Sequence, residues 1–198
     1  MLSNPETAMI FRKLVDRENI TVVMDDSSLG IRHRSDFSQK MFGEFQNMAK
    51  LYSGMDREDK FIYDQELVEI ERFGLFLEIK YFKTGNDKII QEADNTSDVK
   101  SVIKDNEQII ISNFNNYLDF INKEKAFSKE ALQNYAAGID ESFQVLMETF
   151  PNGNYNNMLS KANDMERKII DPNVKKSLNN LIAKLKAKTE TVSEEIVP

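Results

Sequence analysis

The amino-acid sequence predicts a mainly α-helical fold, a bundle of about six helices with at most a small β element near residues 20–34. Apolar residues recur at helical spacing through almost all of residues 97–189. Glycine and proline are few, 7 and 4 in 198 residues, and they gather in turns rather than between short strands. These observations favour helices over sheets throughout most of the chain.

The first 34 residues hold the expected β element. Asn4 followed by Pro5 is typical of a helix start, with an asparagine cap and a proline at the first helical position. Residues 20–24, Ile-Thr-Val-Val-Met, are rich in β-branched side chains and predict one short strand. Residues 25–30 follow with strong turn chemistry.

Two further helices are expected between residues 36 and 87. Asp36 can cap a helix that runs to about Tyr52. The segment that begins at Asp56 is too apolar for a single stripe, which predicts a helix buried on most sides. Residues 75–81 also alternate between apolar and polar, so a strand stays open there. Residues 84–87, Thr-Gly-Asn-Asp, are predicted to end the segment.

The polar residues 91–97 are predicted to separate an N-terminal helical subdomain, 1–90, from an antiparallel helical bundle, 97–189, and residues 190–198 to form a frayed tail. Ser128 is expected to cap one helix and Asp171, followed by Pro172, another. Residues 151–154 predict a turn. The first two apolar stripes of this half are Val99, Ile103, Ile110, Phe114, Tyr117 and Ile121, then Leu132, Tyr135, Ile139, Phe143, Leu146 and Phe150.

Composition excludes several classes of function. The net charge is −7, whereas nucleic-acid binding usually needs a basic surface, so we expect no nucleic-acid partner. The chain has no cysteine and one histidine, so thiolate zinc sites, iron–sulfur clusters and thiol catalysis are excluded. Nucleotide-binding and hydrolase motifs are absent from the sequence. We therefore expect no metal, no cofactor and no enzymatic activity.

The sequence offers little indication of location. Its first residues lack the basic start and apolar run of a signal peptide. No apolar run approaches the roughly 20 residues that cross a bilayer. The cytoplasm is the default expectation, with a removed leader left open. Abundant lysine, asparagine and isoleucine suit an AT-rich bacterial genome.

The densest polar cluster lies in residues 25–36 and is one candidate binding site. Carboxylates and guanidinium groups surround the single histidine there and could meet a charged partner. In an extended segment, Arg32 and Arg34 would point to one face and His33 to the other, which weakens the idea of a single converging site. A solvated connector whose charges pair locally is the alternative. The candidate residues are Asp25, Asp26, Arg32, His33, Arg34 and Asp36.

A second candidate is the acidic stripe of Asp64, Glu71 and Glu78, which are spaced by seven. On a helix these carboxylates would line one edge and could meet a basic partner. The alternative is the solvent-facing edge of an otherwise buried helix.

The leading hypothesis for function is a non-enzymatic protein-interaction module, such as a bacterial inhibitor, immunity factor or adaptor, that binds a protein with a basic surface. A small-molecule or lipid binder with an apolar cavity between helices is the second hypothesis, since aromatic residues accumulate on the stripes. An enzyme that uses His33 with Asp25, Asp26 or Asp36 is the third. No motif is specific enough to indicate a family, and the oligomeric state stays open.

Overall fold

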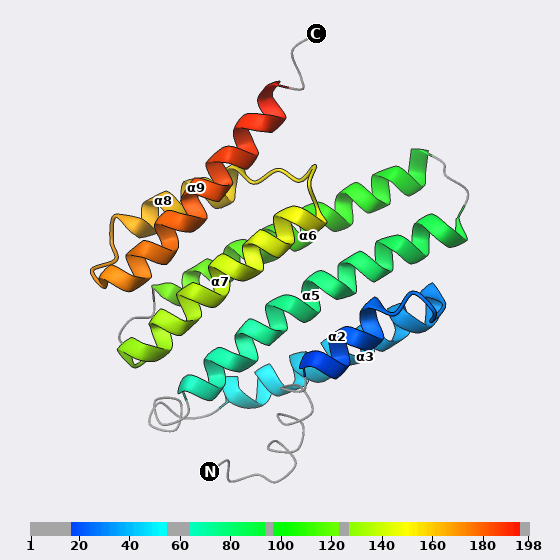
Figure 1. Cartoon of the computed structure of the whole chain (residues 1–198), viewed down its shortest axis with the longest axis horizontal. Coiled ribbons are helices and arrows are strands. Elements are labelled where there is room, and N and C mark those ends of the chain that lie inside the picture. Colours follow the sequence, from blue (N-terminus) through cyan, green and yellow to red (C-terminus); the bar gives the residue numbers. More distant parts are fainter. Residues whose placement is uncertain (1–16, 55–63, 94–96, 123–126, 195–198) are drawn as a thin grey trace. The chain divides into compact units, whose positions relative to one another are not determined.

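The computed structural model describes residues 17–54, 64–93, 97–122 and 127–194, and every regular element in these ranges is an α-helix (Figure 1). The predicted helical fold is therefore confirmed. The expected starts at Asn4 and Asp56 lie outside the described residues. The helices within these described ranges are α2 (Arg17–Asp25), α3 (Ile31–Ser53), α5 (Asp64–Glu92), α6 (Ser97–Ile121), α7 (Lys129–Thr149), α8 (Asn156–Glu166) and α9 (Pro172–Glu194).

The chain divides by packing into two compact units, Met1–Ile103 and Lys104–Pro198. The division falls inside α6, which is a single continuous helix. The expected division into 1–90 and 97–189 stays a prediction.

The predicted strand at residues 20–24 is wrong, because this segment is helical in α2. Ile20 and Met24 lie one turn apart and are 6% and 1% exposed, whereas Val22 is 64% exposed. The helix thus buries one apolar side, and α2 packs against α3. The free energy gained by burying these apolar side chains outweighs the β propensity of valine and isoleucine.

Helix α3 begins at Ile31, five residues before the expected cap at Asp36. The turn predicted before it is present, with the Leu29 amide donating to the Asp26 carbonyl over 3.1 Å. The Gly30 carbonyl accepts the first bond of the helix, from the Arg34 amide. Glycine is an accepted N-cap residue, so the chain enters the helix here. Residues 31–34 are therefore helical rather than part of the β element expected near residues 20–34.

Helix α5 contains both the alternating segment and the predicted stop, so neither the strand at 75–81 nor the end at 84–87 is found. Leu75, Leu77 and Ile79 are at most 1% exposed, which confirms a helix buried on most sides. The Thr84 hydroxyl donates to the Lys80 carbonyl over 2.8 Å, an interaction within the helix that satisfies a polar side chain 2% exposed. Because α5 packs against α3, the helix continues through Gly85.

The second unit holds α7, α8 and α9, with α9 packing against both α7 and α8. The predicted caps are confirmed: the Ser128 hydroxyl accepts from the Ala131 amide over 3.2 Å, and Asp171 accepts from the Val174 amide over 3.1 Å. The predicted turn at 151–154 separates α7 from α8. Helix α9 continues to Glu194, and residues 195–198 lie outside the described ranges. The expected frayed tail at 190–198 stays a prediction.

Candidate interaction surface

Three charged residues of the 25–36 cluster pair with α5. Asp25 accepts from Lys80 at 2.5 Å, and the Arg32 guanidinium lies 2.8 Å from the Glu92 carboxylate. Asp36 lies 3.6 Å from the Lys88 ammonium group. Arg32 and Asp36 are one turn apart on α3, as Lys88 and Glu92 are on α5, so the two helices match in register. These exposed pairs each stabilise the unit by roughly 0–1 kcal/mol and tie the cluster to α5.

The other three residues of the cluster do not converge with them. The Asp26 carboxylate accepts from the Ser28 hydroxyl and amide at 2.6 and 2.8 Å, and these bonds lower its pKa. His33 is exposed on α3. Arg34 is half-buried, and among the described residues its buried Nε has no hydrogen-bond partner. Each carboxylate considered as a partner for His33 therefore interacts with another side chain: Lys80, Ser28 or Lys88.

The expected acidic stripe is not an exposed edge. Asp64 and Glu78 are 4% and 3% exposed, and Glu71 is half-buried. Because α5 is buried on most sides, a spacing of seven residues does not keep its polar side chains in solvent. The prediction of an accessible stripe is wrong for Asp64 and Glu78, and neither side chain is placed to contact a partner.

The aromatic residues of the second unit pack against one another. The ring centroids of Phe120 and Tyr135 lie 4.6 Å apart, and those of Phe114 and Phe143 lie 5.1 Å apart. The Tyr135 hydroxyl donates to the Tyr117 carbonyl over 3.1 Å. These contacts are those of a packed core.

A surface that sequence reasoning missed runs along α6. The buried residues of this helix lie on one side, Ile110, Ile111, Phe114, Leu118 and Ile121. Among residues 104–116, which belong to the second unit, six occupy an arc of about 140° on the other side at 100° per residue, and five of them are exposed while Asn113 is half-buried. We call this set the α6 face: Asp105, Gln108, Ile109, Ser112, Asn113 and Asn116.

The α6 face combines one aliphatic side chain with one carboxylate and has no lysine or arginine. Ile109 is 50% exposed, and Asp105 is exposed as well. A signal was present in the sequence, since Ile109 falls about 100° away from the stripe residue Ile110 that follows it.

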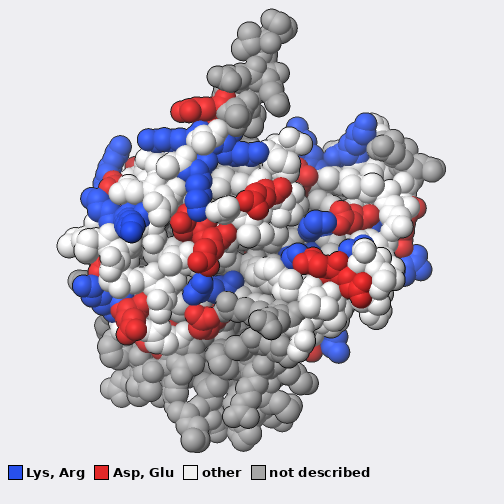
Figure 2. Space-filling view, in the orientation of Figure 1, with Lys and Arg blue, Asp and Glu red and all other residues white. Residues whose placement is uncertain are grey.

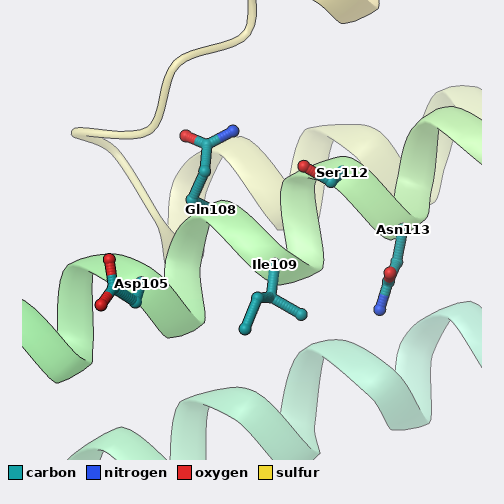
Figure 3. A pocket seen from close by; sticks show the side chains of 5 residues that line it. All are labelled: Asp105, Gln108, Ile109, Ser112 and Asn113. Atoms are coloured by element: carbon teal, nitrogen blue, oxygen red, sulfur yellow. The ribbon is translucent and has the colours of Figure 1, made fainter.

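Five residues of the α6 face line a hollow of about 420 Å³ (Figure 3). In Figure 3, Ile109 and Asn113 project from one side of the helix, and Gln108 projects from the opposite side. The remaining two lining residues are Asp105 and Ser112. One of the five lining side chains is aliphatic and four carry polar groups.

Charge on the displayed side of the molecule is mixed, with acidic and basic side chains interspersed (Figure 2). Across the described ranges, no three histidine, aspartate or glutamate side chains gather in a way that could hold a metal ion. Of the helices described, none is long and apolar enough to cross a membrane.

Comparison with known proteins gives no relative for this chain: no protein-family model, curated protein or solved structure matches it.

Proposed function

We propose that this chain is a non-enzymatic interaction module that binds another protein through the α6 face, and that the partner presents a basic surface. The observation that carries the proposal is the exposed Ile109 beside the acidic Asp105 at the hollow on α6. Single exposed aliphatic residues are ordinary on a protein surface. An exposed isoleucine that lines a hollow is an anchor of the kind that is buried at interfaces.

Electrostatics supports a basic partner. The chain carries a net charge of −7, which favours encounter with a positively charged molecule. On the α6 face itself the charged side chain is Asp105, which would attract a lysine or arginine of the partner. A bacterial inhibitor, immunity factor or adaptor would work in this way, by covering or positioning its partner.

The proposal is tested by affinity capture from a lysate of the cells that make the protein. The expected result is one stoichiometric protein with a basic surface, released as salt is raised from about 0.05 to 0.5 M because screening weakens its attraction. Native mass spectrometry of the same preparation gives the second readout. Absence of any stoichiometric protein, or a bound small-molecule mass in its place, would contradict the proposal.

A further inference from the structure

A chemically reactive pair of residues lies in the turn between α7 and α8, within the second unit. Asn152 is exposed and is followed by Gly153, at the one place in the 198 residues where glycine follows asparagine. Glycine has no Cβ atom, so its backbone nitrogen can attack the preceding side-chain amide with the least steric hindrance. We propose that Asn152 is a modification site, at which this attack converts asparagine to aspartate or isoaspartate when the turn opens.

The reaction needs water as its single co-reactant. The Gly153 nitrogen loses its proton and bonds to Cγ of Asn152, the bond from Cγ to Nδ2 breaks, and ammonia leaves with that proton. The product is a succinimide ring. Water then opens the ring at one of its two carbonyl carbons: attack at Cγ gives aspartate, and attack at the main-chain carbonyl carbon gives isoaspartate. Nothing is oxidised or reduced, and the chain gains one carboxylate.

Packing favours glycine at position 153. A Cβ atom there would lie 2.1 Å from Cδ1 of Ile111 on α6 and 3.2 Å from the ring of Tyr155. Ile111 and Tyr155 are each 1% exposed, so a side chain at position 153 would require a rearrangement of buried residues. The core of the second unit therefore favours the residue that makes Asn152 reactive.

The closed turn holds the pair in a geometry that does not react. The Gly153 amide donates to the Phe150 carbonyl over 3.2 Å, with Pro151 at the second position of the turn. Asn152 has a negative φ, which excludes a type II turn and fits type I, where ψ at this position is about 0°. At that ψ the Gly153 nitrogen is turned away from the Asn152 side chain. Ring closure requires a rotation about ψ that breaks the bond to Phe150.

Opening of the turn therefore sets the rate of modification in the folded protein. One backbone hydrogen bond stabilises a turn only modestly, so the closed form should outnumber the open form by about 2- to 10-fold. We expect Asn152 to react more slowly in the folded protein than in the unfolded chain by this same factor. It should still react faster than every other asparagine of the folded chain.

The two products affect the second unit differently. Aspartate leaves the backbone unchanged. Isoaspartate adds one methylene group to the main chain before Gly153, which separates the Gly153 amide from the Phe150 carbonyl. That carbonyl also accepts from the hydroxyl of buried Tyr155 over 2.8 Å. The isoaspartate form should therefore unfold at a lower urea concentration than Asn152→Asp, and equal midpoints would contradict the role given to this turn.

The test incubates the full chain at mildly alkaline pH, folded in buffer and unfolded in guanidinium chloride, at one temperature. Peptide mass spectrometry then follows the conversion of each asparagine. Asn152→Gln is the matched control, because its longer side chain would have to close a less favourable six-membered ring and should not react. Pro151→Gly removes the fixed φ of the turn and should raise the folded rate about 2- to 5-fold without changing the unfolded rate.

The inference is supported if Asn152 is the fastest site in the folded protein and if unfolding accelerates it by about 2- to 10-fold. A ratio outside this range would overturn it, since a smaller ratio means that the turn does not control the reaction and a larger one means that the fold protects Asn152. Faster conversion of another asparagine in the folded protein would overturn it as well. The comparison of folded with unfolded wild type stays decisive if Pro151→Gly fails to fold.

Discussion

Replacing Gly74 by alanine tests the packing of α5 against α3. A Cβ atom at Gly74 would lie 1.9 Å from Cζ of Phe45 and 2.3 and 2.4 Å from its two Cε atoms. Ordinary contact begins at 3.4 Å, so the ring has to withdraw by at least about 1.5 Å. Phe45 is only 4% exposed, and the whole ring must move because three of its atoms are involved.

Two opposing effects set the magnitude for Gly74→Ala. Overpacking a core costs about 1–3 kcal/mol. Alanine in place of glycine within a helix gains about 0.5–1 kcal/mol. The net expectation is a loss of about 1–2 kcal/mol in the free energy of unfolding of the first unit. Gly85→Ala, in the same helix, meets nothing within 4 Å and should instead stabilise the unit by about 0.5–1 kcal/mol.

Urea unfolding followed by circular dichroism measures both variants, and the opposite signs are the diagnostic result. The Gly74→Ala change is then repeated in a Phe45→Leu background, where the shorter side chain should remove most of its cost. If Gly74→Ala stabilises the protein as much as Gly85→Ala does, the close approach of α5 to Phe45 is wrong.

Three smaller perturbations test other parts of the fold. Asp171→Ala should cost about 1 kcal/mol at pH 7 through loss of the α9 cap. Burial raises the pKa of Asp171, but bonds from Val174, Gln133 and Asn173 outweigh it and the net pKa is lowered. The difference from wild type in a pH series of urea unfolding should therefore persist above pH 3.8 and vanish as pH falls below it. Tyr155→Phe removes a hydroxyl that donates to the Phe150 carbonyl over 2.8 Å and should cost about 1 kcal/mol in thermal unfolding. Burial, and then the charge of Glu107, raise the pKa of Tyr155, so above pH 10.0 the wild type should lose stability faster than this variant. Asp25→Asn should cost less than about 1 kcal/mol, with the difference shrinking at high salt, because the pair with Lys80 is partly exposed; a larger loss in urea unfolding would contradict this.

Local chemistry was sufficient to predict the caps and the stripes of the second unit. The Ser128 and Asp171 side chains cap their helices through bonds to amides three residues further along the chain. Such a local spacing can be recognised in the sequence alone. The stripe from Leu132 to Phe150 is buried because α7 has one apolar side, which periodicity reveals.

The errors arose where distant contacts override local preference. Residues 20–24 form a helix because Ile20 and Met24 are buried together, a contact that β propensity does not encode. Thr84 lies inside α5 because it is buried and its hydroxyl bonds to Lys80 and contacts Ser38 of α3 at 2.6 Å. The pair of Asp25 with Lys80 joins residues 55 positions apart, so local sequence patterns could not indicate it.

The most direct test of the account is photo-crosslinking from position 109 in the cells that make the protein. A benzophenone amino acid replaces Ile109 on the α6 face, and the same group at Ile170, 86% exposed, is the control. Position 109 should yield a crosslink to one basic partner protein, and position 170 should not. Equal crosslinking from both positions, or crosslinks from 109 only to a second copy of this chain, would contradict the account.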